Sequence, residues 1–191
     1  MLLRGEKMDG NTGLLPARGN DAIDILVNDH QIIKGLLNQL SSASDTQARK
    51  GVLEQLKGIL TIHNATEENL VYPALQTLAG KKAEAEHLYH ETAEADVLVF
   101  EMVTILKEDD DAKFDAKAKK FVDAVLEHID DEEKKSFPHL RDAAEPRQAQ
   151  LLTESVREFR NSLRFIAADG RAGTSQVTGY ETGKPAPISK E

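Results

Sequence analysis

Two stretches of this chain share one spacing of residues. The segment IHNATEENLVYPAL (residues 62–75) and the segment EHIDDEEKKSFPHL (residues 127–140) both contain His-x-x-x-Glu-Glu, followed after three positions by an aromatic residue, a proline and, one residue later, a leucine. A histidine and a glutamate four residues apart project from the same face of an α-helix. The repeat therefore predicts two helices that each present an imidazole beside a carboxylate.

Apolar residues recur every three or four positions along four segments, which is the pattern of amphipathic helices. We expect the first helix from Asp21 to Leu40 and the second from Asp45 to near Pro73. The third should cover about residues 81–107 and the fourth about 113–136, where Pro138 is expected to end it. Short loops favour antiparallel neighbours, so the predicted fold is all-α, an antiparallel up-down-up-down four-helix bundle over residues 20–142.

Three further segments are predicted outside the bundle. Residues 1–19 lack periodicity and read as a flexible N-terminal arm, and residues 169–191, rich in Gly, Thr, Ser and Pro, read as a disordered tail. Residues 147–168 form a C-terminal amphipathic helix, which should dock on the bundle or on a second chain. The apolar face of this helix is expected to point inward and consists of Leu152, Val156, Phe159, Leu163 and Ile166. The basic face is expected to point outward and consists of Arg157, Arg160 and Arg164.

Charge and cysteine content exclude several classes of function. The net charge of -9 argues against nucleic acid or an anionic membrane as the main partner, because both would repel this chain. The absence of cysteine excludes disulfides, thiolate-bound metals and cysteine nucleophiles. No stretch approaches 18 apolar residues and no leader is evident at the N-terminus, so a cytoplasmic location is expected.

The carboxylates of the repeat lie on the faces that the helices are expected to bury. A buried ionised carboxylate needs a compensating charge, and neither lysine nor arginine lies near it on these stripes. The first and third helices carry His30 and His90 at corresponding depths. We therefore expect these imidazoles to converge with both repeats on a bound cation.

The ligand types narrow the choice of metal. Imidazole and carboxylate together suit iron, manganese or zinc, and six or seven ligands are too many for one tetrahedral ion. Two ions bridged by Glu67 and Glu132 would use the whole set, leaving a position where a small ligand could bind.

The arrangement His30, His63-x-x-x-Glu67-Glu68, His90, His128-x-x-x-Glu132-Glu133 resembles the hemerythrin-like HHE cation-binding family over about residues 21–142. The resemblance implies a bundle around two non-heme iron ions with a bridging oxo or hydroxo group, which handles oxygen or related small species. It implies that each iron has terminal histidine ligands, namely His30, His63, His90 and His128. It also implies that two glutamates bridge the irons, Glu67 and Glu132.

The sequence departs from the oxygen-carrying hemerythrins at two ligand positions. Those proteins have a second histidine four residues after the first in the third helix, and an aspartate in the fourth helix. This chain has Glu94 and Glu132 there, which makes Glu94 a candidate seventh ligand and disfavours reversible oxygen carriage.

The other side chains near the repeat are predicted to play lesser parts. His87 competes with His90 for the ligand position, or else lies behind it as an outer partner or gate. The remaining candidates are not expected to bind metal: Glu68, Glu133 and His139 as surface residues, and Tyr72 and Phe137 as plugs of the bundle core.

Three classes of function remain open from the sequence. The favoured one is a binding protein that binds or senses oxygen, nitric oxide or iron at a dinuclear site. The second is a di-iron oxidoreductase that decomposes hydrogen peroxide or another small oxidant, in which Glu94 would favour oxidised iron. The third is a helical interaction module with a structural metal. The chain is expected to be a monomer, or a homodimer formed through the C-terminal helix.

Overall fold

The computed structural model describes residues 20–108 and 110–168, which are helical with short connections and contain no strand. The fold class is all-α, as predicted. The helices are α1 (Ala22–Ser42), α2 (Thr46–Thr66), η1 (Glu67–Val71), α3 (Tyr72–Thr77), α4 (Lys82–Glu108), α5 (Asp111–Asp131), η2 (Glu132–Ser136), α6 (Phe137–Ala143) and α7 (Pro146–Ala168). The predicted arm (1–19) and tail (169–191) lie outside the described residues.

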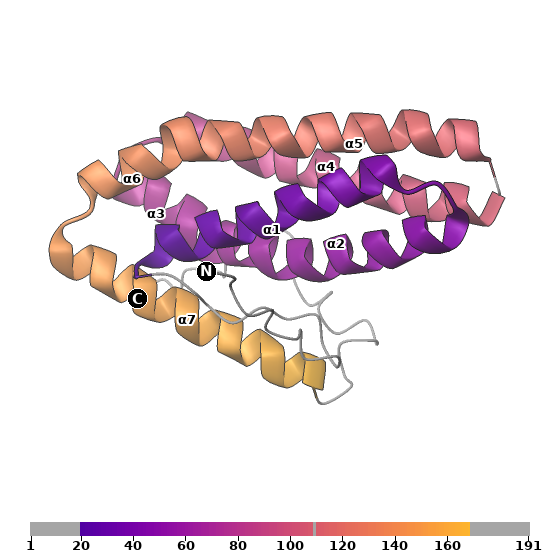
Figure 1. Ribbon diagram of the computed structural model, residues 1–191. Coiled ribbons are helices and arrows are strands. Elements are labelled where there is room, and N and C mark those ends of the chain that lie inside the picture. Colours follow the sequence, from indigo (N-terminus) through magenta and orange to yellow (C-terminus); the bar gives the residue numbers. More distant parts are fainter. Residues whose placement is uncertain (1–19, 109, 169–191) are drawn as a thin grey trace, which may run out of the picture.

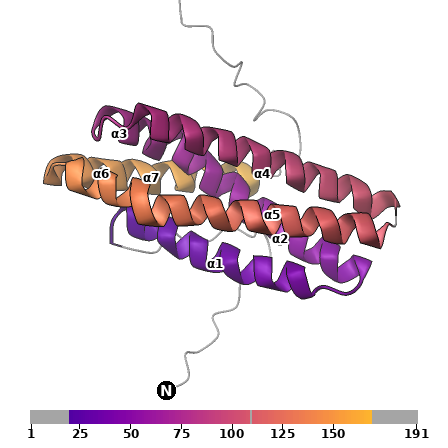
Figure 2. The same cartoon turned by 90° about the horizontal axis from the view of Figure 1, so that it is seen from above.

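The long helices α1, α2, α4 and α5 lie side by side in a bundle, and their connections alternate between its two ends (Figure 1). Seen from above, α5 runs lengthwise between α4 and α1 (Figure 2), and it contacts both of them. The predicted C-terminal helix α7 lies along the outside of the bundle, where it packs on α1, α2 and η1 (Figure 1). It docks within the chain.

Aspartates begin three of the helices where the sequence predicts helix starts. The side chains of Asp21, Asp45 and Asp110 accept hydrogen bonds from the backbone N–H three residues later, so each satisfies one free donor of the first turn. Asp110 belongs to the acidic run 108–111, which was expected to favour the start of the fourth helix. The capping residues therefore define the position at which each of these helices begins.

Two π-helical turns interrupt the helices at matching places in the repeat. In η1 the Tyr72 N–H bonds to the Glu67 carbonyl, and in η2 the Phe137 N–H bonds to the Glu132 carbonyl, both five residues back. Residues five apart would face about 140° away from each other in an α-helix. The wider turn brings the glutamate and the aromatic residue of each copy to the same buried side.

The same turns correct the prediction that proline ends these helices. Beyond Pro73 the chain continues as α3 to Thr77, and beyond Pro138 as α6 to Ala143. Proline lacks an N–H and collides with the carbonyl four residues earlier in an unbroken α-helix. It is tolerated here because it lies in the first turn after a π-turn has shifted the hydrogen bonds.

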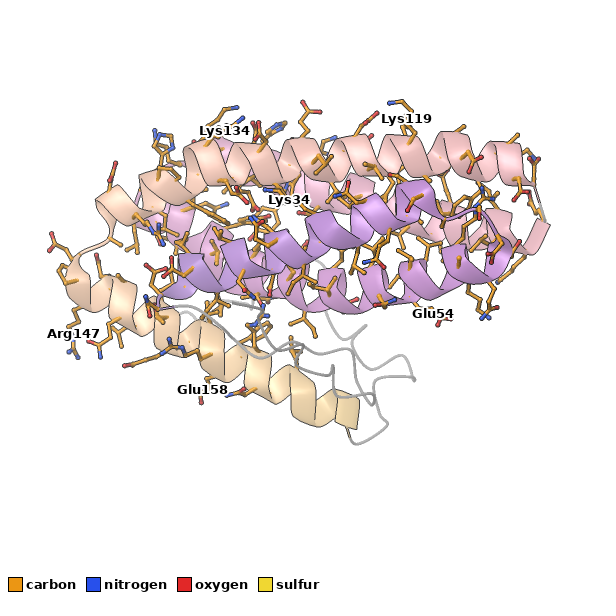
Figure 3. The ribbon with its side chains drawn as sticks, viewed as in Figure 1. Lys34, Glu54, Lys119, Lys134, Arg147 and Glu158 are labelled. Carbon is orange, nitrogen blue, oxygen red and sulfur yellow. The ribbon has the colours of Figure 1, made fainter. Side chains whose placement is uncertain are left out.

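The apolar core forms two clusters, and the second includes the aromatic residues and leucines of the repeat. One cluster is built from α1, α2, α4 and α5 around Leu37, Leu56 and Phe121, and the other surrounds Leu26, Tyr72 and Phe137. Charged side chains such as Glu54, Lys119 and Glu158 project away from the bundle (Figure 3). In the described ranges 20–108 and 110–168, no helix is apolar enough over a sufficient length to cross a membrane.

Candidate metal centre

Five of the predicted ligands come together in the middle of the bundle. They are supplied by five elements: His30 from α1, His63 from α2, Glu67 from η1, His128 from α5 and Glu132 from η2. His30, Glu67 and Glu132 are fully buried, and His63 and His128 retain 2% and 8% of their exposure. The two copies of the repeat therefore contribute to one site.

Four of these residues converge on one point. Each of His30, His63, Glu67 and Glu132 offers a ligand atom within 4.8 Å of the others. His63 Nε2 lies 3.1 Å from Glu67 Oε1, and His30 Nε2 lies 3.2 Å from Glu132 Oε2. These four atoms are buried and close together, yet they are not aligned as hydrogen bonds and lack a hydrogen-bond partner among the described residues. Because buried polar atoms are normally paired, such a set is suited to a cation.

Each histidine of the centre has a carboxylate on its other ring nitrogen. The Nδ1 atoms contact carboxylate oxygens at 2.9 Å (His30 to Glu133), 3.4 Å (His63 to Asp29) and 3.0 Å (His128 to Glu91). Such a contact fixes the ring and leaves Nε2 as the metal-binding atom. The sequence reading missed Asp29 and Glu91 as outer partners and treated Glu133 as a solvated charge. Their signal was weak: Asp29 and Glu133 only adjoin ligands in the sequence.

Helix α7 contacts one of these outer carboxylates, Asp29, through Arg160. Its side chain is 3% exposed, and it donates to both oxygens of Asp29 at 2.7 and 3.1 Å. The prediction that Arg160 faces outward is therefore wrong, because it neutralises a buried carboxylate that the sequence reading did not place in the core. Burial opposes ionisation of Asp29, but hydrogen bonding to His63 and the charge of Arg160 lower its pKa. Asp29 is thus an anion that orients His63.

Tyr72 closes the other side of the centre. Its hydroxyl lies 2.9 Å from Glu132 Oε1, 3.2 Å from Glu67 Oε2 and 3.4 Å from His128 Nε2. Burial and both carboxylates raise the pKa of Tyr72 well above its usual value, so the phenol stays protonated and donates. Tyr72 is a core plug, as predicted, but one that also bonds into the site. A second cation beside His128 would have to share this space with the hydroxyl or displace it.

The two inward carboxylates behave unequally. Burial and the neighbouring Glu132 raise the pKa of Glu67 well above its usual value. Burial acts the same way on Glu132, but the imidazoles of His128 and His30 outweigh it and lower its pKa. Without a cation, burial and mutual repulsion thus oppose ionisation of both carboxylates together. A cation that binds between them favours the doubly ionised pair.

His90 and Glu94 do not reach the centre. Both side chains are exposed on the outer face of α4, whereas the inward face carries Leu88, Thr92 and Ala95. The prediction of these two residues as ligands is therefore not supported by their placement. Val97 lies seven residues after His90 on the same face of α4 and is 58% exposed, so this face is turned to solvent although it carries an apolar residue.

The remaining histidines lie outside the buried set. His87 is exposed, with its Nε2 3.1 Å from Glu91, so it belongs to the surroundings of an outer partner of the centre. His139 is half-buried and contacts Glu84 at 3.1 Å. Glu68 is half-buried too, and burial raises its pKa.

A small cavity of about 10 Å³ adjoins the centre beside His63 and His128. Its wall combines His63, His128, Asn64 and Thr92 with five apolar side chains: Ile33, Leu60, Ala95, Val125 and Ile129. This volume is about that of one water-sized group. The space beside the ligands thus admits a very small molecule and little else.

Comparisons with known proteins agree with this geometry. A sequence profile of the hemerythrin HHE cation binding domain matches residues 21–140. A DNA nickase from Nostoc sp. is 24% identical over 146 residues, which cover 74% of this chain and 41% of that protein. The chain thus spans about two fifths of that relative's length. In the crystal structure of a hemerythrin HHE cation binding domain-containing protein from Mycobacterium kansasii, the same fold is found at 23% identity and a TM-score of 0.64, over 81% of this chain and 96% of that one.

Proposed function

Because this chain belongs to the hemerythrin HHE cation-binding domain family, we propose that it binds non-heme iron and uses it to bind or sense oxygen or nitric oxide. The observation that carries the proposal is the convergence of four buried ligand atoms without hydrogen-bond partners within 4.8 Å. Domains of this family bind metal cations, and the nitrogen and oxygen ligands found here suit iron.

The ligands divide into two unequal groups. His30 and His63 with one oxygen of each carboxylate form the first position. The other oxygens of Glu67 and Glu132 face the Tyr72 hydroxyl together with His128 Nε2, and we assign the second iron of a dinuclear centre to this side. Bridged by Glu67, Glu132 and an oxo or hydroxo group, the two irons would supply reversible electron exchange with a small oxidant.

The residues around the centre orient the metal ligands and limit the size of the molecule that can bind. Asp29, Glu91 and Glu133 orient the three imidazoles through Nδ1, which strengthens metal binding. Tyr72 donates a hydrogen bond toward the carboxylates, so a proton lies within reach of the centre. The cavity of about 10 Å³ has room for about one water-sized group, which favours a very small ligand over an organic substrate. A binding or sensing role fits these features better than turnover of a larger substrate.

The peroxide-decomposing alternative loses the residue that was expected to favour oxidised iron, because Glu94 is exposed on α4 and away from the centre. The location in the cytoplasm and the absence of nucleic-acid and membrane partners stay predictions based on the charge and hydropathy of the chain. The possible dimer through α7 stays a prediction too, although α7 buries Val156 and Arg160 within its own chain.

Iron reconstitution of the purified chain tests the proposal. The wild type should bind about two irons per chain and, when oxidised, show charge-transfer absorption of a bridged ferric pair in the near ultraviolet. Nitric oxide added to the reduced protein should give a new absorption spectrum. Glu132→Gln should lose the iron, and Glu127→Gln, an exposed glutamate on the same helical segment, should keep it. Equal iron content in both variants would refute the assigned centre, and rapid peroxide consumption by the wild type would favour the enzyme.

A further inference from the structure

A second group of potential ligands lies at the surface between α4 and α5. His87, Glu91 and Asp131 each offer a ligand atom within 4.8 Å of the others. His87 Nε2 lies 3.1 Å from Glu91 Oε1 and 3.9 Å from Asp131 Oδ2. None of the three is assigned to the buried set, and His87 is 59% exposed.

An ordinary surface ion pair explains only part of this group. His87 and Glu91 are four residues apart on α4, the common spacing of a helical pair. Asp131 comes from a different helix, and it directs a second carboxylate at the same imidazole nitrogen. One Nε2–H can donate to one acceptor, so two anionic oxygens compete for one proton. A divalent cation satisfies all three atoms at once.

The other atoms of both carboxylates are already engaged. Glu91 Oε2 accepts from His128 Nδ1 at 3.0 Å, and Asp131 Oδ1 accepts from Lys135 at 2.7 Å. The oxygens left over, Glu91 Oε1 and Asp131 Oδ2, are those that face His87. The contacts to His128 and Lys135 thus aim the free oxygens at one another across the imidazole.

Glu91 also joins this group to the buried centre. Its two oxygens connect His87 at the surface with His128 inside. Of the five inward ligands, His128 is the most exposed, at 8%. Among the inward ligands, the one on the α4 and α5 side is therefore the most open to solvent.

We propose that His87, Glu91 and Asp131 form a surface site for a divalent first-row cation, such as Fe²⁺ or Mn²⁺, which holds the ion before it passes to the buried centre. One imidazole and two carboxylates with water in the open positions suit these ions. Binding at the surface stands independently of the proposed function. The staging role rests on that function, because it requires a metal-binding centre inside.

Manganese binding tests the surface site directly. In the double variant Glu67→Gln, Glu132→Gln, which replaces the buried carboxylates by isosteric amides, the free Mn²⁺ signal in electron paramagnetic resonance should fall as one ion binds. Adding His87→Ala or Asp131→Asn should weaken this binding by roughly tenfold or more, the scale on which even an outer partner alters metal affinity. His90→Ala is the matched control, an exposed histidine on the same helix, and should change nothing.

The wild type supplies a second readout if the double variant does not fold. Mn²⁺ should broaden the backbone amide signals of residues 87, 91 and 131 more in the wild type than in His87→Ala, because broadening by an ion in the buried centre is common to both proteins. Equal broadening in the two proteins, or unchanged Mn²⁺ affinity in His87→Ala and Asp131→Asn, overturns the surface site.

Loading kinetics test the staging role. Wild type and His90→Ala should take up Fe²⁺ at the same rate, and Asp131→Asn should reach the same final iron content about tenfold more slowly. Equal rates in all three overturn the staging role. If the wild type takes up no iron inside while Mn²⁺ still binds at His87, the proposed function fails and the surface site stands.

Discussion

The segment formed by α2 and η1 and the segment formed by α5 and η2 carry the same motif but have different neighbours. In the first, His63 and Glu67 lie beside α1, which contributes His30 as a further inward ligand. In the second, His128 lies beside α4, whose inward residue at this depth is Thr92, and Glu132 reaches across to His30 of α1 at 3.2 Å. The duplication of the motif therefore does not extend to the partner helices, and the centre is richer in histidine on the α1 side.

The aromatic residues of the two copies support the centre in different ways. Tyr72 of the first copy donates to Glu132 of the second at 2.9 Å. Phe137 of the second copy stacks on the ring of His30, with centroids 5.6 Å apart and planes 10° from parallel. Each copy thus braces a ligand outside itself, so a change in one copy should disturb metal binding by the other.

The largest expected effect separates the two histidines of the repeat. His63→Ala removes one of the four converging ligand atoms, so metal affinity should fall by at least about 100-fold. His128→Ala leaves those four atoms intact and should retain about one metal ion per chain. Metal analysis after dialysis measures both variants. Equal loss in the two would show that the copies contribute alike, against this comparison.

The outer partner of His63 should come next. Arg160→Met leaves Asp29 buried and uncompensated, and we expect a loss of roughly 3–5 kcal/mol in the free energy of unfolding. Asp29→Asn should also be destabilising, because it leaves the buried Arg160 guanidinium without its carboxylate. Urea unfolding of both single variants and of the double variant provides the measurement. If the double variant is no more stable than the worse single variant, the pair is not coupled as described.

Exchange of the aromatic residues tests the cross-bracing. Tyr72→Phe gives the first copy the aromatic residue of the second. It removes the hydroxyl that, among the described residues, alone donates a hydrogen bond to Glu132 Oε1, so the free energy of unfolding should fall by about 1–3 kcal/mol. Phe137→Tyr is the matched reverse change and buries a hydroxyl beside His30. Thermal unfolding of the metal-free variants measures both. An unchanged melting temperature for Tyr72→Phe would contradict the assigned hydrogen bond.

The smallest effect concerns a surface tie between α1 and α6. Hydrogen bonding to Arg141 is the main cause that lowers the pKa of Asp24 below 3.8. Its stabilisation is therefore present above pH 3.8 and is lost as the pH falls through the lowered pKa. Because Asp24 is 38% exposed, solvent screens the pair, and Arg141→Met should cost less than about 1 kcal/mol at pH 7. The difference between wild type and variant in urea unfolding should shrink toward pH 3, and a growing difference would reverse the sign.

Features set by local interactions or by the repeated spacing could be predicted from the sequence, and the π-turns could not. The helix starts followed from Asp21 and Asp45, because capping is a local interaction. The inward positions of His63, Glu67, His128 and Glu132 followed from a spacing that occurs twice. Pro73 and Pro138 misled because proline usually ends a helix, and a π-turn is not signalled by hydropathy.

The face of α4 could not be predicted for a different reason. Val97 and Phe100 are apolar, yet they are 58% and 73% exposed. Counting Val97 as core carries His90, seven residues earlier on the same face, inward in error. Arg160 and Asp29 were missed because their pairing joins α7 to α1, and a contact between distant segments leaves no periodic trace in the sequence.

Crystallography of the iron-loaded protein at the iron absorption edge tests the central claim, that both copies of the motif share one buried centre completed by His30. The strongest anomalous peak should lie between His30, His63, Glu67 and Glu132, at about 2.1 Å from the imidazole Nε2 atoms, a usual metal-to-imidazole distance. A strongest peak beside His90 and Glu94, with none between these four residues, would contradict it.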